Sequence, residues 1–407
     1  MPSEDFAITS AEGHELSGAL ELPTGPVRGG AVFAHCFTCT RQSRAAVSIA
    51  RALAARGIAC LRFDFTGLGA SEGEFGRAGF ASDVSDLVAA VTAVKARVGG
   101  PILLVGHSLG GAAALAAGAA LGRESIAALA TIAAPSDVAH VLGVMKGDHD
   151  AILREGEGEV SIGGRPFTIS RAFLQRMEAA SLLDLVKDMR VPYLALHSPR
   201  DTVVGIDHAS ALFGAAFHPK SFVSMDGADH LLTRAEDAEF AADVIAGWAK
   251  RYLPLREDWP MPDEGVVVQT GHGRFGTEVH TTAHRFLADE PRSYGGDDTG
   301  PTPYDLLLAA LGTCTAMTMK LYANRKGWPF EGARIHLTHE RNHEEDCEHA
   351  LEDGVRIEAL NRAIEVLGDD LTDDQRARIM AIAGQCPVHR TLEGHLHIHT
   401  RDRGAKG

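Results

Sequence analysis

Long apolar runs and a basic surface are both missing from this 407-residue sequence. No stretch of about 18 consecutive apolar residues is present, which argues against a membrane span. The start, MPSEDFAITS, lacks the basic and apolar regions of a signal peptide, so we expect a cytoplasmic protein. Lys and Arg number 39 against 54 Asp and Glu, which gives a net charge of -15. Without a basic stripe, neither nucleic acid nor a membrane is expected as a partner.

Cysteine is also scarce, because six residues in so long a chain do not form a disulfide framework. Each cysteine is therefore interpreted as a packed or a reactive thiol. Cys36 and Cys39 have C-x-x-C spacing, which is typical of redox motifs. That redox motif opens a helix, whereas these two residues follow an apolar strand in a loop. We interpret them as a packed thiol pair.

The first 250 residues alternate short apolar runs with Ala-rich helical stretches, and this alternation predicts a doubly wound α/β sheet. The expected parallel strands lie at 31–37, 58–65, 101–107, 128–134, 191–197 and 220–227. Residues 6–22 are expected to add an antiparallel hairpin at the edge. A mixed segment at about 136–189 contains a hairpin pattern and a helical pattern, and we expect it to form a small lid over the strand ends.

A Pro- and acid-rich stretch at 256–265 predicts a linker between a first domain, 1–255, and a second, 266–407. The second domain has mixed-face strands before a long helix from about 302 to 325, and two further probable strands after it, although the later of these has a helical periodicity too. A capping box formed by Thr372 and Gln375 predicts another helix, and HLHIHT predicts a last strand. Together these elements predict a smaller α+β domain.

The motif G-x-S-x-G occupies 106–110, between an apolar strand and an Ala-rich helix. Glycines on both sides allow Ser108 to sit on a sharp, strained turn that exposes its hydroxyl. The helix that follows aims its N-terminus, with the Leu109 N–H, at the oxyanion that forms when a serine attacks a carbonyl. Ser108 is therefore the candidate nucleophile.

A serine nucleophile needs a histidine and a carboxylate at the same edge of the sheet. Asp201 follows one predicted strand and His230 follows the next, in the order Ser, Asp, His. His35 is a competing histidine, but it lies where an oxyanion loop would begin. In that loop the Phe37 backbone N–H is the best candidate for the second oxyanion donor.

Residues 1 to about 255 resemble the α/β-hydrolase family, on the strength of GHSLGG and of the stretch 64–73, which is similar to D-x-R-G-x-G-x-S-x-G with Thr66 in place of Arg. Cys36 stands where the family has the Gly of an H-G pair. The resemblance implies carboxylesterase-type acyl hydrolysis of an ester or thioester by a Ser108, His230 and Asp201 triad, with no cofactor and no metal. The short lid favours small or medium acyl groups.

Two cysteines of the second domain stand in unusual surroundings. Cys314 lies among small and hydroxyl-bearing residues of the long apolar helix, and Cys386 follows a helix and precedes Pro387. A lone buried cysteine is usually an inert apolar residue. Two such sites allow one thiol to attack an oxidant and the other to resolve the product.

These two segments resemble the OsmC, or organic hydroperoxide resistance, family over roughly 265–400. The resemblance implies that Cys314 attacks a hydroperoxide, that Cys386 closes a disulfide, and that an external dithiol reduces it. It also implies a homodimer with the site at the subunit interface. An arginine must lower the pKa of the attacking thiol, and Arg285 and Arg274 are the candidates.

In better known members of that family a glutamate ten residues before the cysteine holds the arginine, and here Tyr304 occupies that position. Asp305, one residue on, is a candidate substitute. An alternative interpretation makes the second domain a non-catalytic dimerisation module for the esterase.

Histidines of the second domain include His336, His339, His343 and the alternating set at 395, 397 and 399. Alternation places three imidazoles on one strand face, but no partner cysteine motif is nearby, and Cys347 is isolated. A solvated face is favoured over a metal site.

Overall fold

The computed structural model describes residues 1–75, 79–162, 165–178, 182–253, 262–342 and 357–402. Its contacts divide the chain into two compact units, Met1–Gly300 and Pro301–Gly407. The segment between 266 and 300, which we had expected in the second domain, is grouped with the first unit. Most of the predicted linker lies outside the described residues, so the predicted domain boundaries stay a prediction.

The described residues of the first unit build an eight-stranded sheet in the order β1-β2-β4-β3-β5-β6-β9-β10. The strands are β1 (Ser3–Thr9), β2 (Glu15–Glu21), β3 (Gly29–Ala34), β4 (Ile58–Phe63), β5 (Ile102–His107), β6 (Ile126–Ile132), β9 (Tyr193–His197) and β10 (Lys220–Ser224). From β4 to β10 neighbouring strands are parallel, and β1 and β2 form the expected antiparallel edge. All six predicted parallel strands are confirmed.

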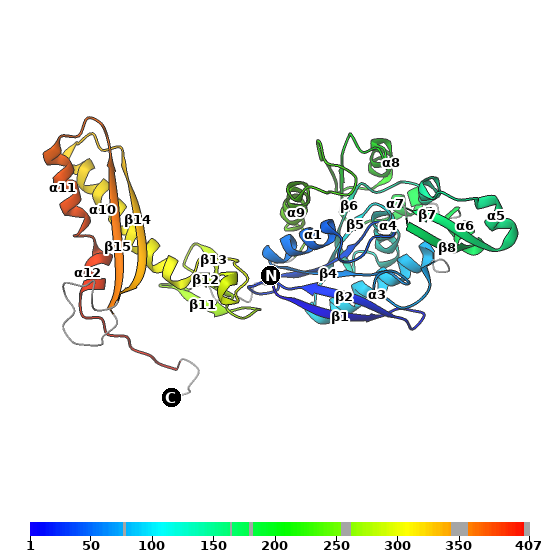
Figure 1. Ribbon diagram of the computed structural model, residues 1–407, viewed down its shortest axis with the longest axis horizontal. Helices are drawn as coiled ribbons and strands as arrows, with labels where there is room; N and C mark the ends of the chain where they lie inside the picture. The colour runs from blue at the N-terminus through cyan, green and yellow to red at the C-terminus, as the bar shows by residue number, and fades with distance from the viewer. Residues whose placement is uncertain (76–78, 163–164, 179–181, 254–261, 343–356, 403–407) are drawn as a thin grey trace. The chain divides into compact units, whose positions relative to one another are not determined.

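Helices cover both faces of this sheet (Figure 1). Buried side chains of α1 (Arg44–Ala55) and α9 (Ala235–Ala249) form one apolar core with one face of the sheet. Those of α3 (Phe80–Val98), α4 (Leu109–Leu121) and α8 (Ile206–Ala215) form the other. Strands that are buried on both faces have continuous apolar sequences, and for this reason their positions could be predicted from the sequence.

The predicted lid segment folds as η1 (Val138–Val144), α5 (His149–Glu155), β7 (Glu157–Ile162), β8 (Arg165–Ser170), α6 (Arg171–Glu178) and α7 (Leu182–Asp188). The expected hairpin is β7 and β8, paired antiparallel. The expected helix corresponds to α6 and α7, and residues 179–181 between them lie outside the described residues. Arg165 of the hairpin donates a hydrogen bond of 2.7 Å to the carbonyl of Thr38, just beyond the end of β3. The hairpin therefore contacts the edge of the sheet at which parallel strands end.

A second, three-stranded sheet belongs to the first unit and consists of β11 (Val267–Thr270), β12 (Thr277–His280) and β13 (Arg285–Ala288), followed by η2 (Arg292–Tyr294). Buried Glu278 of β12 pairs with Arg28 beside β3, and the Met1 amino group lies 2.8 Å from Asp297. Gly271 is packed so closely that a Cβ there would lie 1.7 Å from the Thr24 carbonyl oxygen. These contacts bind the small sheet to the first strands of the chain.

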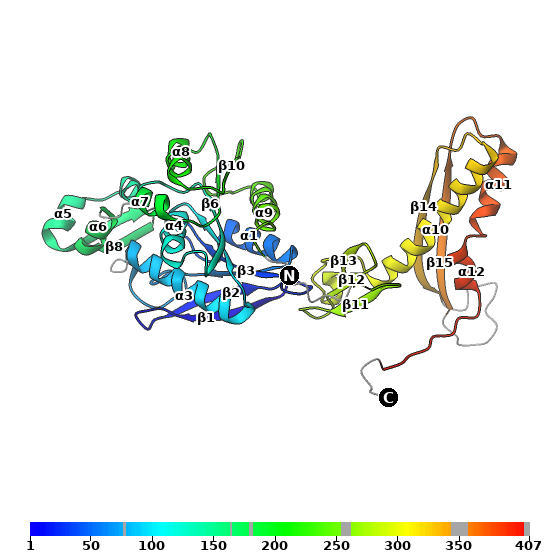
Figure 2. The same cartoon turned by 180° about the vertical axis from the view of Figure 1, so that it is seen from behind.

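The second unit consists of α10 (Pro303–Lys326), the antiparallel pair β14 (Gly332–Asn342) and β15 (Ile357–Leu367), α11 (Asp373–Ala383) and α12 (Pro387–Glu393). Figure 2 shows α10 and α11 beside this hairpin. The capping box of Thr372 and Gln375 is confirmed, and β15 is a strand, which settles its ambiguous periodicity. The strand predicted at HLHIHT is wrong, since residues 395–400 have no strand partner here. A strand needs a neighbour for its backbone groups, and the local pattern carries no information on one.

One described helix, α10, is long and apolar enough to cross a membrane by length and composition, with a mean hydropathy of 1.4. Its apolar residues are interrupted by Thr and Gly, so the helix contains no long unbroken apolar run although its mean hydropathy is high. The core helices of soluble proteins pass the same test, so it is weak evidence for a span.

Candidate active sites

Ser108 stands between β5 and α4 in a strained conformation with φ of 55° and ψ of -125°. The flanking glycines are required by space. A Cβ on Gly106 would lie 2.4 Å from the Gly110 carbonyl oxygen, and one on Gly110 would lie 2.3 Å from the His35 carbonyl oxygen. The motif therefore forms the sharp strand-to-helix turn that the sequence predicts.

Asp201 and His230 lie in the loops after β9 and β10, and both side chains reach Ser108. His230 Nε2 is 3.0 Å from Ser108 Oγ, and His230 Nδ1 is 2.7 Å from Asp201 Oδ2. A carboxylate only accepts, so Nδ1 carries the proton and Nε2 is free to accept from the serine hydroxyl. The three predicted residues are thus joined in one hydrogen-bonded chain.

Burial by itself would raise the pKa of Asp201, since its carboxylate is removed from water. Hydrogen bonds from His230 and from the backbone N–H groups of Val204 and Val203, at 3.0 Å and 2.8 Å, outweigh that effect and lower the pKa. Asp201 is therefore ionised at neutral pH. A carboxylate must be ionised if it is to orient a histidine and stabilise the histidine cation.

His107 contacts the backbone of His230, and the sequence analysis did not single it out. Its Nε2 donates a hydrogen bond of 2.7 Å to the His230 carbonyl, and its ring lies 5.5 Å from the His230 ring. Burial, assisted by the charge of His230, lowers the pKa of His107 to about 4. The neutral ring therefore holds the backbone of His230. Its place inside the nucleophile motif was the available signal.

Cys36 and Cys39, in the loop after β3, form a disulfide. The interpretation of these residues as a packed pair of free thiols was therefore wrong. Between them Thr38 has a φ of 58°, the left-handed region that β-branched residues rarely adopt. Within the described part of the chain, neither the Phe37 nor the Leu109 backbone N–H donates to a protein acceptor. Phe37 and Leu109 also line one small cavity. Two unpaired donors are thus available beside Ser108.

His35 lies in this loop and not in the hydrogen-bonded chain of Ser108. Its Nδ1 donates 2.8 Å to the Cys36 carbonyl, and burial lowers its pKa, so the ring is neutral. On the other side of the loop, the Arg41 N–H donates to Asp64 Oδ1 at 2.6 Å. The glycine-rich motif that begins at Asp64 therefore anchors the exit of the loop.

An aromatic cluster extends from Phe37, in the loop after β3, to the segment predicted as a lid. The Phe37 and Phe75 rings are 5.6 Å apart, and Phe75 also contacts the lid residues Phe167 and Phe173, at 5.1 Å and 5.7 Å. Asp83 of α3 lines the same cavity as Phe37. Burial and the charge of Asp86 raise the pKa of Asp83. An apolar acyl group fits such a lining.

In the second unit the two predicted cysteines lie together. Cys314 is half-buried on α10, Cys386 is buried at the start of α12, and the Cys314 side chain helps to lower the pKa of the Cys386 thiol. Thr315 Oγ1 lies 3.6 Å from Cys386 Sγ, and the His389 N–H donates to the same sulfur at 3.4 Å. One chain alone therefore brings both sulfurs into one site.

Arg362 of β15 is a second residue that sequence analysis missed. Its Nη1 donates 2.8 Å to Thr315 Oγ1 and 3.2 Å to the Ala383 carbonyl. Burial would raise the pKa of Cys386, but hydrogen bonds from Thr315, His389 and Cys314, together with the Arg362 charge, lower it. No sequence motif marks Arg362, because only the strand pairing places it beside the thiol.

Comparison with protein families gives two matches. Residues 31–277 match the model described as alpha/beta hydrolase family. The chain belongs to the alpha/beta hydrolase family. In this hydrolase a second match, to OsmC-like protein, covers residues 295–401.

Solved structures similar to the hydrolase region include the esterase domain of a Rhodothermus marinus protein, which is 45% identical, covers 62% of this chain and 100% of that one, and has a TM-score of 0.51. Est1E from Butyrivibrio proteoclasticus with bound ferulic acid is 22% identical, with 61% and 98% coverage and a TM-score of 0.53. A putative hydrolase from Agrobacterium vitis is 20% identical, with 62% and 100% coverage and a TM-score of 0.52. The latter two support the fold alone. No curated protein matches the chain.

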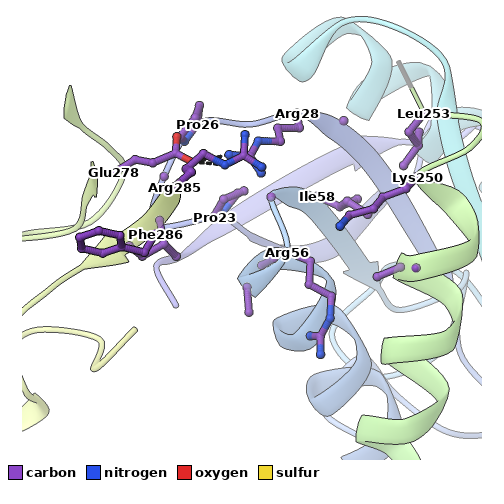
Figure 3. A pocket seen from close by; sticks show the side chains of 18 of the residues that line it. Pro23, Pro26, Arg28, Arg56, Ile58, Lys250, Leu253, Glu278, Arg285 and Phe286 are labelled. Carbon is purple, nitrogen blue, oxygen red and sulfur yellow. Dashed lines mark hydrogen bonds and ion pairs between the residues drawn. The ribbon is translucent and has the colours of Figure 1, made fainter. Parts of the chain in front are cut away.

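The predicted activators of Cys314 have other contacts in this hydrolase. Arg285 Nε lies 3.2 Å from buried Glu278, and Arg274 stacks on Phe275 at 5.0 Å. Figure 3 shows Arg28, Glu278 and Arg285 together at a cavity of about 340 Å³, which no triad residue lines. Both arginines belong to the first unit and Cys314 to the second, so a role in thiol activation stays a prediction.

Asp305 accepts from the Thr302 N–H and hydroxyl, at 2.9 Å and 2.8 Å, in the capping box of α10. It precedes Cys314 by nine residues, so the helical rise places it about 13 Å along the axis from the cysteine of its own chain. Tyr304 stacks on His339, with ring centroids 4.0 Å apart. Neither side chain supports Cys314 within one chain.

A metal site receives no support from the part of the chain that the structure describes, where no group of three or more His, Cys, Asp or Glu is suited to hold an ion. His395, His397 and His399 are exposed there and lie outside any strand. His343 and Cys347 lie outside the described residues.

Proposed function

We propose that the hydrolase region cleaves carboxylic esters or thioesters through an acyl intermediate on Ser108. The hydrogen-bonded chain from Ser108 Oγ through His230 to Asp201 carries this proposal, at 3.0 Å and 2.7 Å. The 45% identity with an esterase domain supports the same reaction class.

In the proposed mechanism, His230 Nε2 takes the proton of Ser108 as Oγ attacks the carbonyl carbon. Asp201, held ionised by three hydrogen bonds, stabilises the resulting imidazolium. His230 then returns the proton to the leaving alcohol or thiol. A water molecule, activated by the same histidine, releases the acid and regenerates the serine.

The negative oxygen of each tetrahedral intermediate would bind to the backbone N–H groups of Phe37 and Leu109. Donors of this type contribute about 3 kcal/mol each in the transition state. The aromatic cluster of Phe37, Phe75, Phe167 and Phe173 favours a small or medium apolar acyl group, since the short lid closes over that side.

For the OsmC-like region we propose thiol-based reduction of organic hydroperoxides. The Cys314 thiolate attacks the outer peroxide oxygen, the O–O bond breaks, and the alcohol leaves with a proton. Cys386 then attacks the Cys314 sulfenic acid, which releases water and forms a disulfide, and an external dithiol reduces it. The effect of Cys314 on the pKa of Cys386, together with the contact of the neighbouring Thr315 with Cys386 Sγ at 3.6 Å, supports this pairing.

A second candidate role for this region is dimerisation without catalysis. Exposed apolar side chains favour it, since Met317 and Leu321 of α10 are 64% and 60% exposed and Ile398 is 91% exposed. A surface of this kind in a single chain fits an interface with a second copy. A homodimer is compatible with both roles, so the assay must measure the thiols themselves.

The deciding experiment crosses two variants with two assays on the full chain. Ser108→Ala should abolish ester hydrolysis and spare hydroperoxide consumption, and Cys314→Ser should do the reverse. One equivalent of organic hydroperoxide should remove two thiols from the wild-type chain, and a dithiol should restore them. Unchanged thiols would refute the peroxidase and leave dimerisation, whereas ester turnover by Ser108→Ala would refute the proposed nucleophile.

A further inference from the structure

The disulfide between Cys36 and Cys39 encloses the two residues that define the oxyanion loop. Its Cα atoms are 5.3 Å apart, and the Cys39 N–H donates 3.0 Å to the Cys36 carbonyl, which makes a tight turn. Inside the turn, Thr38 is held at a φ of 58°. A β-branched residue avoids this conformation unless its surroundings impose it. The disulfide is one such constraint.

The remaining contacts of the loop fix its ends and its outer side. His35 donates to the Cys36 carbonyl at 2.8 Å, Arg165 donates to the Thr38 carbonyl at 2.7 Å, and Arg41 binds Asp64 through its N–H. None of these contacts engages the Phe37 N–H. The Phe37 N–H lies in the peptide plane between Cys36 and Phe37, and both torsions that orient this plane, Cys36 ψ and Phe37 φ, belong to the ring that the disulfide closes.

Resting on the esterase function proposed above, we propose that the Cys36–Cys39 disulfide positions the Phe37 N–H as an oxyanion donor, and that a dithiol lowers ester hydrolysis by reducing it. Cys36 and Cys39 are positioning residues in this account, because neither touches the substrate.

The more exposed of the two sulfurs is the one that the dithiol attacks first. Cys36 is 5% exposed, whereas Cys39 is half-buried. A thiolate of the dithiol attacks Cys39 Sγ, the S–S bond breaks, and Cys36 leaves as a thiolate that takes up a proton. The second thiol of the reductant then attacks the mixed disulfide, which frees the Cys39 thiol and leaves the reductant as a cyclic disulfide. Two electrons pass to the protein, and a small-molecule disulfide reverses the reaction.

Reduction opens the ring, so that the Thr38 φ can return to negative values and the peptide plane between Cys36 and Phe37 can rotate. The Phe37 N–H then points away from the developing oxyanion while Ser108, His230 and Asp201 keep their contacts. Loss of one oxyanion donor lowers kcat by about 100-fold to 1000-fold. Because His35 and Arg165 still hold the loop, we expect a fall in kcat of about 10-fold or more, with KM nearly unchanged.

The test measures kcat and KM of the full chain for an ester before and after dithiol treatment. Mass spectrometry of the alkylated peptide that contains residues 36–39 establishes its redox state. The same preparations are titrated with a trifluoromethyl ketone, a transition-state analogue whose affinity should fall in parallel with kcat. The reaction of Ser108→Ala with dithiol is subtracted, because free thiols cleave activated esters.

The double variant Cys36→Ser, Cys39→Ser should match the reduced wild-type enzyme, ignore the dithiol and unfold at a temperature well above that of the assay. Cys60→Ala is the matched control, since Cys60 is a free buried cysteine of β4, and it should keep the full dithiol response. A reduced loop with unchanged kcat, or with a raised KM alone, would overturn the proposal while leaving Ser108 as nucleophile. Dithiol-independent turnover that also survives Ser108→Ala would refute the esterase function itself.

Discussion

His107 provides a test in which catalysis and stability separate with pH. The perturbation is His107→Leu, with His107→Gln as the matched control. The histidine donates 2.7 Å to the His230 carbonyl, and burial with the His230 charge keeps its pKa at about 4. Leucine removes both the donor and the titrating group. Glutamine removes only the titrating group, because its amide nitrogen reaches nearly as far as Nε2.

At pH 7 the leucine variant leaves the His230 carbonyl without its donor. An unsatisfied group of this kind costs about 1 to 3 kcal/mol of the free energy of unfolding. The same loss lets His230 shift relative to Ser108 and Asp201, so kcat should fall. The glutamine variant should keep most of the stability and most of kcat.

At acid pH the difference in free energy of unfolding between the wild type and His107→Leu should shrink or change sign. Between the ordinary value of 6.5 and about 4, the unfolded chain holds a proton on His107 that the folded chain lacks. Stability therefore falls as the pH drops through that window, by 1.36 kcal/mol per pKa unit, or about 3 kcal/mol in total. Neither variant has this loss, so the deficit of the leucine variant should vanish or change sign near pH 4.5.

Urea unfolding at several pH values between 7 and 4.5 measures these free energies, and steady-state ester hydrolysis at pH 7 measures kcat. A difference between wild type and His107→Leu that stays constant with pH would refute the assignment of a neutral, buried His107. Full kcat in the leucine variant would refute its role in holding His230.

Three further changes follow from the same geometry. Gly110→Ala should lower the free energy of unfolding by about 1 to 3 kcal/mol, because its Cβ would lie 2.3 Å from the His35 carbonyl oxygen, and an unchanged thermal midpoint would contradict this. Asp83→Asn should stabilise the protein more at pH 8 than at pH 4, as measured by urea unfolding. The pKa of Asp83 is raised in the folded state, so the wild-type protein loses free energy of unfolding as the pH rises, and the asparagine variant does not. Equal effects at both pH values would count against this reasoning. Arg362→Met should raise the pKa of Cys386, measured as thiolate absorbance against a Cys386→Ser reference, while Arg362→Lys should keep it low; no shift in the methionine variant would exclude the charge effect.

Local patterns made the first site predictable from the sequence. The apolar strands, the glycines around Ser108 and the chain order of Asp201 and His230 each depend on a few neighbouring residues. Parallel strands that end at one edge then bring the three side chains together without further information. The same holds for Thr372 and Gln375, whose capping box needs only one turn of helix.

Other features depend on contacts between distant residues or on one covalent bond. Arg362 reaches Thr315 and Cys386 only because β15 pairs with β14 and lies against α10, which no short pattern encodes. The disulfide of Cys36 and Cys39 has the spacing of a redox motif, but its loop context favoured free thiols. The strand expected at HLHIHT lacked a partner, and alternation alone does not supply one.

Labelling with a fluorophosphonate during ester turnover tests the central claim most directly. We predict one label per chain, located by mass spectrometry on the peptide that contains Ser108, with loss of ester hydrolysis in proportion to labelling. An ester such as the substrate itself should slow the labelling by competition. A label on another residue, or full hydrolysis by a chain labelled at Ser108, would contradict the account.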